Sequence, residues 1–202
     1  MTAYESEHPL HRIIGQALKV TFGSQPDTVV LLDSACGGSE HVQLFCSAPL
    51  TCASRLCKVD AAIEYRGEVK VAIEIEESNI SPVQLGGKSF AVSLSRLCKG
   101  HAGVFPVCAD LLFVQVIDIK NLPANSTKLD QCLKLLQMIP SSLTTPERRL
   151  RYAIHYGTVE MFQTPSEQLA LLDDISEHVG RSGEPIVNHA GILSVNSNPA
   201  LR

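Results

Sequence analysis

Three carboxylates in the first half of the chain, Asp60, Glu74 and Glu76, have the types and spacing of a chemical site. They fall on two predicted strands, residues 57–64 and 68–76, which a tight turn joins into a hairpin. Side chains alternate along a strand, so Glu74 and Glu76 share one face. Carboxylates gathered in this way repel one another and resist ionising together unless a cation lies between them. Hard oxygen ligands favour Mg²⁺ or Mn²⁺ over zinc, and the pattern therefore indicates a divalent-metal site suited to phosphodiester chemistry.

Helical and strand patterns alternate along the chain and place these carboxylates in a mixed sheet. A helix should begin sharply after the second strand, because Ser81 can act as N-cap, Pro82 occupies the first helical position and Gln84 completes a capping box. The passage from that strand through the helix to a later buried strand implies a parallel crossover, and hence an α/β fold with a mixed β-sheet flanked by helices. The predicted elements are helices at 8–20, 81–98, 126–138 (ended by Pro140) and 164–178, and strands at 29–32, 41–45, 57–64, 68–76, 111–118 and 150–156.

Length and composition indicate one folded domain. The chain has 202 residues, of which 45% are hydrophobic, enough to bury one sizeable core over residues 1–182. Residues 183–202 are rich in Gly, Asn, Ser and Pro and are predicted to form a loosely held tail. No run approaches the roughly 18 apolar residues needed to cross a bilayer, and the N-terminus is acidic and polar, unlike a secretory signal. We therefore expect a soluble, cytoplasmic protein without a membrane partner.

The charge balance restricts how the protein could bind nucleic acid. The formal net charge is −4, which argues against a large non-specific DNA-binding surface, because phosphate contacts normally require a basic excess. A metal-dependent nuclease is compatible with this charge, since an acidic cluster lowers the total. The candidate phosphate contacts are Lys58 and an arginine run that comprises Arg148, Arg149 and Arg151. The alternative for the arginine run is an ordinary solvated face.

Other residues with chemical potential form weaker patterns. The seven cysteines are an odd number, so a disulfide framework is not expected; Cys52 and Cys57 could belong to a structural zinc site, or the cysteines could be buried free thiols. Leu85–Ser89 is similar to the end of a phosphate-binding Walker A loop, but the first Gly of that motif is absent. His8 and His11 share a helix face, where histidines without a third ligand are more often partly exposed surface residues.

The order of the elements and the placement of the carboxylates resemble the PD-(D/E)XK nuclease superfamily, whose restriction-endonuclease-like fold has an α-β-β-β-α-β core. In that family an Asp begins the second core strand, and an acidic-x-Lys triplet lies on the third. Asp60 matches the first feature, and Glu74-Ile75-Glu76 matches the second after 13 intervening residues, with Glu76 in place of the lysine and Val59 in place of the family's Pro. The helix predicted after the triplet falls where the family has its crossover helix. The resemblance covers roughly residues 8–139, and a subset of type II restriction enzymes has the same Glu-x-Glu variant.

The resemblance implies a DNA endonuclease that hydrolyses phosphodiester bonds with Mg²⁺, or with Mn²⁺ as a substitute. Asp60 and Glu74 would hold the cation, with the Ile75 carbonyl as a further ligand. Glu76 would accept a proton from water or help to hold a second metal. Lys88 is the candidate for the missing positive charge, and its alternative is an exposed helical lysine.

The resemblance also implies a substrate and an assembly. The substrate would be double-stranded DNA, and Gln84, near the strand end, would orient water or phosphate. A small single domain suits a type II restriction enzyme that works as a homodimer, each subunit cutting one strand of a palindrome. Repair nucleases, junction resolvases and phage nucleases share the same core. Because the triplet lysine is missing, a non-catalytic nucleic-acid-binding or assembly module on the same fold is the alternative, and an α/β protein of unrelated function is a third hypothesis.

Overall fold

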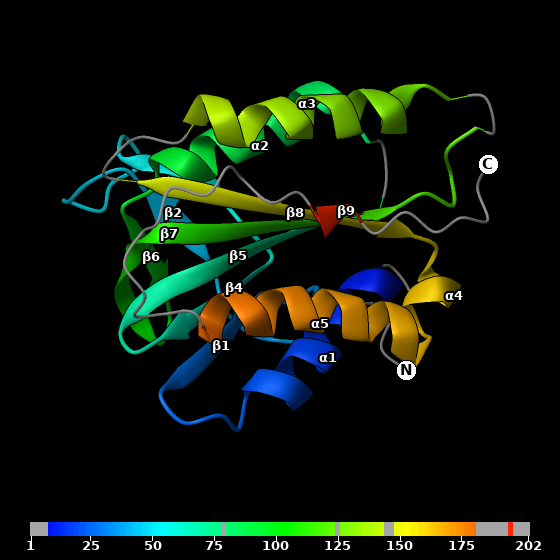
Figure 1. Ribbon diagram of the computed structural model, residues 1–202. Coiled ribbons are helices and arrows are strands. Elements are labelled where there is room, and N and C mark those ends of the chain that lie inside the picture. Colours follow the sequence, from blue (N-terminus) through cyan, green and yellow to red (C-terminus); the bar gives the residue numbers. More distant parts are fainter. Residues whose placement is uncertain (1–7, 78–79, 124–125, 144–147, 181–193, 196–202) are drawn as a thin grey trace.

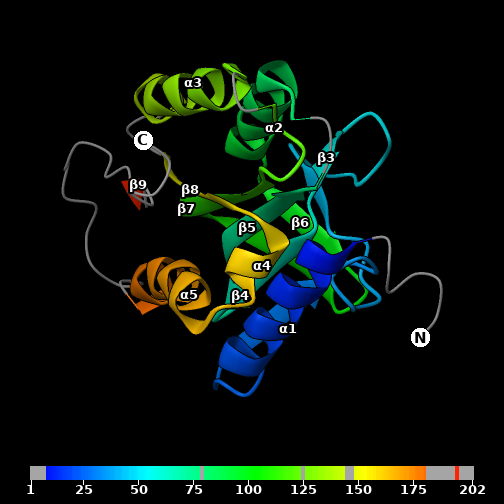
Figure 2. The same ribbon diagram turned by 90° about the vertical axis from the view of Figure 1, so that its right-hand side faces the viewer.

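The protein folds as a mixed β-sheet between two layers of helices (Figure 1). A computed structural model describes residues 8–77, 80–123, 126–143, 148–180 and 194–195. One face of the sheet is covered by α2 (Pro82–Leu94) and α3 (Lys128–Leu143), and the other by α1 (Pro9–Phe22), α4 (Val159–Phe162) and α5 (Pro165–Gly180). Figure 2 shows the same three layers from the side. The predicted α/β class, with a mixed sheet flanked by helices, is confirmed.

Three parallel strands form the centre of the sheet. They are β5 (Glu68–Glu76), β7 (Gly103–Asp118) and β8 (Arg149–Gly157), side by side in that order. The connections from β5 to β7 and from β7 to β8 carry α2 and α3, and both helices lie on one face, as crossovers of a single hand require. On the outer side of β5, β4 (Ala61–Tyr65) and then β1 (Thr28–Leu32) add antiparallel strands, while β9 (Ser194–Val195) pairs in parallel with β8.

A smaller antiparallel ladder branches from the first half of β7. There β6 (Leu97–Gly100) pairs with β7, β2 (Gln43–Phe45) pairs with β6, and β3 (Arg55–Lys58) pairs with β2. The second half of β7, residues 111–118, lies instead between β5 and β8 and is buried along its whole length. The buried strand predicted at 111–118 is therefore correct in type but is only half of a strand that serves both ladders.

Each face of the central strands has its own apolar core. Facing α2 and α3 are Ala72, Phe113 and Tyr152; facing α1 and α5, one residue further along each strand, are Ile73, Val114 and Ala153. All six are almost completely buried. This alternation is what strands covered on both faces require, and it fixes which face of β5 each glutamate occupies.

The predicted helices are confirmed in place but not in all their boundaries. The helix predicted at 81–98 is wrong at its C-terminal end: α2 ends at Leu94, and Cys98 lies in β6 because that segment pairs with β2 and β7. Pro82 occupies the first helical turn, but the side chain of Ser81 makes no cap hydrogen bond, so the predicted capping box does not form. The helix predicted to stop before Pro140 continues to Leu143. The short strands β6 and β9 and the helix α4 were not predicted.

The segment predicted as one strand at 57–64 is two strands, because its halves belong to different ladders. β3 ends at Lys58 in the smaller ladder, and β4 begins at Ala61 in the main sheet. Between them Val59 is buried in the core beneath α2, and its N–H donates to the Val42 carbonyl. Asp60 therefore immediately precedes β4, at the end of the sheet where β5 finishes.

The remaining predictions on organisation concern the tail, the membrane and the cysteines. The tail predicted at 183–202 lies outside the described residues apart from Ser194–Val195, which form β9. Within the described ranges, no helix has the length and apolar character needed to cross a membrane. None of the seven cysteines forms a disulfide; Cys36, Cys98 and Cys132 are buried, whereas Cys46 and Cys52 are exposed.

Candidate active site

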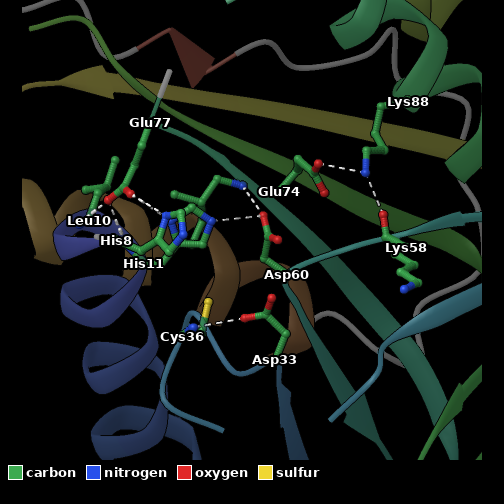
Figure 3. Close-up of polar contacts among 11 residues, drawn as sticks. His8, Leu10, His11, Asp33, Cys36, Lys58, Asp60, Glu74, Glu77 and Lys88 are labelled. Atoms are coloured by element: carbon green, nitrogen blue, oxygen red, sulfur yellow. Dashed lines mark hydrogen bonds and ion pairs between the residues drawn. The ribbon is translucent and has the colours of Figure 1, made fainter. Parts of the chain in front are cut away.

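The predicted carboxylates meet at the end of β5, and Figure 3 shows two of them, Asp60 and Glu74. Glu74 and Glu76 leave β5 on the same face, and Asp60 approaches from the start of β4. The charge of Asp60 acts on both glutamates and contributes to raising the pKa of each, after the larger effect of burial. The hairpin predicted from the sequence therefore does bring the three groups into one electrostatic cluster.

Asp60 is oriented by the backbone of β5 and by α1. Its Oδ2 accepts a hydrogen bond from the N–H of Ile75 at 2.7 Å and lies 3.6 Å from Nε2 of His11. Its own N–H donates to the Ile73 carbonyl, and its carbonyl accepts from the N–H of Asp33. With both its backbone and its carboxylate tied to neighbouring elements, Asp60 has little freedom to turn away from the site.

Glu74 is buried, with 8% of its surface exposed, and it pairs with Lys88 of α2. The Lys88 Nζ lies 2.7 Å from Glu74 Oε1 and also donates to the Lys58 carbonyl at 2.6 Å. Glu74 Oε2, by contrast, is buried without a hydrogen-bond partner. Burial and then the charge of Asp60 raise the pKa of Glu74 to about 8, although Lys88 acts to lower it. One ion pair therefore does not offset the cost of burying this carboxylate beside another.

Glu76 is the last residue of β5 and is partly exposed. Burial and then Asp60 raise its pKa, against the opposing charges of Lys88 and His11. A carboxylate with a raised pKa is a better proton acceptor near neutral pH than an ordinary glutamate. The charge of Lys88 thus acts on both Glu74 and Glu76.

Glu77, the residue after β5, ties the strand to the start of α1. Its Oε1 accepts hydrogen bonds from the backbone N–H groups of Leu10 and His11. Its Oε2 lies 3.1 Å from Nδ1 of His8 and 3.3 Å from Nδ1 of His11. The N-cap residue His8 makes no side-chain cap, so Glu77 instead satisfies free N–H groups in the first turn of α1. The helix dipole also favours a negative charge at this end of α1.

His11 lies between Glu77 and Asp60 and is buried. Burial alone would lower its pKa, but the contacts with Asp60 and Glu77 outweigh that effect and raise the pKa to about 10. Burial acts to raise the pKa of Glu77, but His11, the N–H of Leu10 and His8 together lower it below the ordinary value. The row of charges thus continues from Lys88 and Glu74 through Asp60 to His11 and Glu77.

Lys58 and Gln84, both predicted site residues, lie close to this cluster without joining it. Lys58 contributes its carbonyl to Lys88, while its exposed side chain points away from the carboxylates in Figure 3. Gln84 is exposed on the first turn of α2. Lys88 itself is only 23% exposed in its side chain, so the alternative of an exposed helical lysine does not describe it.

The arginine run lies at the opposite end of the central strands. Glu74 is level with Ile154 of β8, whereas Arg149 begins β8, about 17 Å away along the strand at about 3.3 Å per residue. Arg148 and Arg149 are buried, so they do not form the solvated face that was the alternative reading. Arg151 makes two-pronged hydrogen bonds to Asp110 at 2.9 to 3.1 Å. The structure does not bring these arginines to the carboxylates.

Two weaker patterns are also placed by the fold. Leu85–Ser89 lies inside α2, and the Ser89 hydroxyl donates to the Leu85 carbonyl, so this segment is helix and not a phosphate-binding loop. Cys57 is a partly buried residue of β3, and Cys52 is exposed in the preceding turn.

Sequence reasoning missed the roles of His11 and Glu77. The interpretation of His8 and His11 as partly exposed surface residues is wrong for His11, which is 7% exposed. Their third neighbour, Glu77, is 66 residues from His11 in the chain. The available signal was the three-residue spacing of the histidines together with the Glu that directly follows the triplet, but nothing local links the two.

Comparison of the chain with protein-family models, with curated proteins and with solved structures found no match. Its function has to be argued from the site.

Proposed function

We propose that the protein is a Mg²⁺-dependent DNA endonuclease with a restriction-endonuclease-like core, in which Asp60, Glu74 and Lys88 act together. The observation that carries this proposal is the 2.7 Å contact between Lys88 Nζ and Glu74 Oε1. The resemblance calls for a lysine beside the second acidic residue, yet the triplet has Glu76 there. Lys88 supplies that charge from the helix that follows the strand, which supports an intact site with a relocated lysine.

The donor atoms at this end of β5 suit a hard divalent cation. Glu74 Oε2 is buried without a hydrogen-bond partner, and the charge of Asp60 acts on Glu74. A cation between the two carboxylates would bind the unpartnered oxygen and offset the repulsion between the two negative charges. The N–H and C=O of one strand residue point to the same side, and we therefore expect the Ile75 carbonyl to face Asp60, to which its N–H donates. A Mg²⁺ held by Asp60, Glu74 and this carbonyl would acidify water and neutralise negative charge on a phosphate.

The remaining residues have roles that follow from their contacts. Burial acts to lower the pKa of Lys88, but Glu74 raises it above the ordinary value, so the ammonium stays charged. Two of its three N–H groups are directed to Glu74 and the Lys58 carbonyl, which leaves the third for a phosphate oxygen. Glu76, with its raised pKa, would take the proton of the attacking water. His11, held by Glu77, would keep Asp60 in position.

The proposed substrate is double-stranded DNA and the proposed assembly a homodimer, as for type II restriction enzymes of this kind. Because the net charge is −4, we expect contacts with phosphate to be local, at Lys88 and the exposed Lys58, and not spread over a basic face. The buried Arg148 and Arg149 and the paired Arg151 have no part in the proposed cleavage.

A second candidate, a non-catalytic binding or assembly module on the same fold, is favoured by one observation. Asp60 Oδ2 is already engaged by the Ile75 N–H and lies close to His11. In a module that has lost its metal, such internal partners would replace the cation. This candidate predicts DNA or protein binding that Glu74→Ala leaves unchanged.

The test is cleavage of supercoiled plasmid and phage DNA with Mg²⁺ or Mn²⁺ by the wild type, by Glu74→Ala and by the control Glu68→Ala. Glu68 begins the same strand but pairs with Lys70, away from the site. The proposal expects metal-dependent cutting that only Glu74→Ala abolishes, and discrete bands would indicate a restriction enzyme. Absence of cutting by folded protein with either metal would favour the non-catalytic module.

A further inference from the structure

We infer that His8, His11 and Glu77 form a second metal site, suited to Zn²⁺, which ties the start of α1 to the end of β5. The site uses none of the proposed Mg²⁺ ligands, and it can be present whether or not the protein cuts DNA. Among the described residues, this is the one set of three His, Cys, Asp or Glu side chains whose ligand atoms all lie within 4.8 Å of one another.

Two of the three separations between the donor atoms match those around a tetrahedral zinc ion, and the third lies within 4.8 Å. With metal–ligand distances of about 2.0 to 2.1 Å, neighbouring ligand atoms of a tetrahedron lie about 3.3 Å apart. Glu77 Oε2 is 3.1 Å from His8 Nδ1 and 3.3 Å from His11 Nδ1. Both histidines present the same ring nitrogen, Nδ1, to the same carboxylate oxygen. Imidazole nitrogen is a donor that favours Zn²⁺ and similar ions over Mg²⁺.

An unsatisfied atom points independently to a ligand here. The side chain of His11 is only 9% exposed, and its Nδ1 is buried without a hydrogen-bond partner, despite lying 3.3 Å from Glu77 Oε2. A buried ring nitrogen of this kind is costly unless something binds it. A metal ion among the three side chains would use this nitrogen directly.

The surroundings are those that metal-binding side chains normally have. The other ring nitrogen of His11 faces Asp60 Oδ2 at 3.6 Å, so a carboxylate lies beside the imidazole as it does at many metal sites, at a distance longer than a hydrogen bond. Glu77 is held in turn through Oε1 by the N–H groups of Leu10 and His11. His8 is 43% exposed in its side chain, so the fourth coordination position is open to water.

The competing explanation is a plain ion pair between protonated histidines and Glu77, which the same distances allow. Metal binding distinguishes the two. The full-length chain, prepared without a histidine tag and kept reduced, is stripped with a chelator, and Zn²⁺ alone is titrated by calorimetry. The visible absorption of Co²⁺ then reports whether the bound ion has a tetrahedral environment. The variants are His8→Ala, in which the most exposed ligand is removed, and the control His101→Ala.

His101 is a suitable control because it belongs to another edge-to-face histidine pair, with His41, and is exposed. We expect one tightly bound Zn²⁺ per chain, at least tenfold weaker binding in His8→Ala and unchanged binding in His101→Ala. At the same Zn²⁺ concentration, the rise in melting temperature should be equal in the wild type and His101→Ala and smaller in His8→Ala. Failure to bind Zn²⁺, or binding that His8→Ala does not weaken, would overturn the inference. Neither result decides whether the protein cuts DNA, which Glu74→Ala tests separately.

Discussion

The stability of the metal-free protein should depend on pH through Glu74. Its pKa is raised from 4.5 to about 8 in the folded protein. The folded state therefore keeps a proton that the unfolded chain has released, so the stabilising contribution is complete below about pH 4.5 and is lost as the pH rises through about 8. At about 1.4 kcal/mol per pKa unit, this interval corresponds to at most about 5 kcal/mol, and structural relaxation around the buried pair should reduce it to about half.

Glu74→Gln isolates this effect, because the amide has nearly the same shape and does not titrate. The assay is urea unfolding of the wild type and the variant at pH 5, 6.5 and 8, in the presence of a chelator. We expect the free energy of unfolding of the wild type to fall with pH relative to that of Glu74→Gln, by roughly 2 to 3.5 kcal/mol between pH 5 and pH 8.

The comparison of the two proteins also separates Glu74 from His11. The raised pKa of His11, about 10, makes stability fall above pH 6.5 in both proteins, so it cancels in their difference. If the free energies of unfolding of the two proteins change in parallel from pH 5 to pH 8, Glu74 is ionised throughout this range and its pKa is not raised. Mg²⁺ added at pH 8 should stabilise the wild type by about 1.4 kcal/mol for each tenfold excess over its dissociation constant, and should leave Glu74→Gln unaffected.

Four further substitutions test the other assigned roles. Lys88→Met should reduce the cleavage rate about 100-fold or more, because it removes the positive charge beside Glu74. The control Lys58→Ala, at an exposed lysine, should reduce the rate much less. Equal effects of the two variants in a plasmid assay would contradict the assigned role of Lys88. Glu77→Gln should lower the free energy of unfolding by about 1 to 2 kcal/mol through the weakened cap of α1, and an unchanged urea midpoint would show that the cap contributes nothing. Arg151→Met should cost about 2 kcal/mol through the lost Asp110 pair and leave the cleavage rate unchanged, so a large loss of activity in folded protein would place the arginine run at the site after all.

The predictable part of the site depends on contacts between neighbouring segments. Glu74 and Glu76 share a face because β5 alternates, and Asp60 reaches them because β4 and β5 form a hairpin with few intervening residues. Lys88 lies on the helix that directly follows β5, so the crossover brings it back over the strand it has just left. In each case short sequence separation and strand or helix geometry suffice.

The features that the sequence could not predict depend on contacts between segments that are far apart in the chain. Glu77 caps α1 across 66 or more residues, and the docking of α1 is what turns His11 from a surface histidine into a buried one. Leu97–Gly100 looks like the end of a helix until its partners in β2 and β7 are known. The burial of Arg148 and Arg149 likewise depends on how the start of β8 packs, and not on their own sequence pattern.

The most direct measurement is a time course of supercoiled plasmid conversion in Mg²⁺ by the wild type, with a chelator added midway and Glu74→Ala assayed alongside. The account predicts nicked or linear product that stops accumulating when the chelator is added and that does not form with Glu74→Ala. Cutting that persists after metal removal or in the Glu74→Ala variant, or the absence of cutting by folded wild type with Mg²⁺ and with Mn²⁺, would contradict the assignment of a metal-dependent nuclease site to Asp60, Glu74 and Lys88.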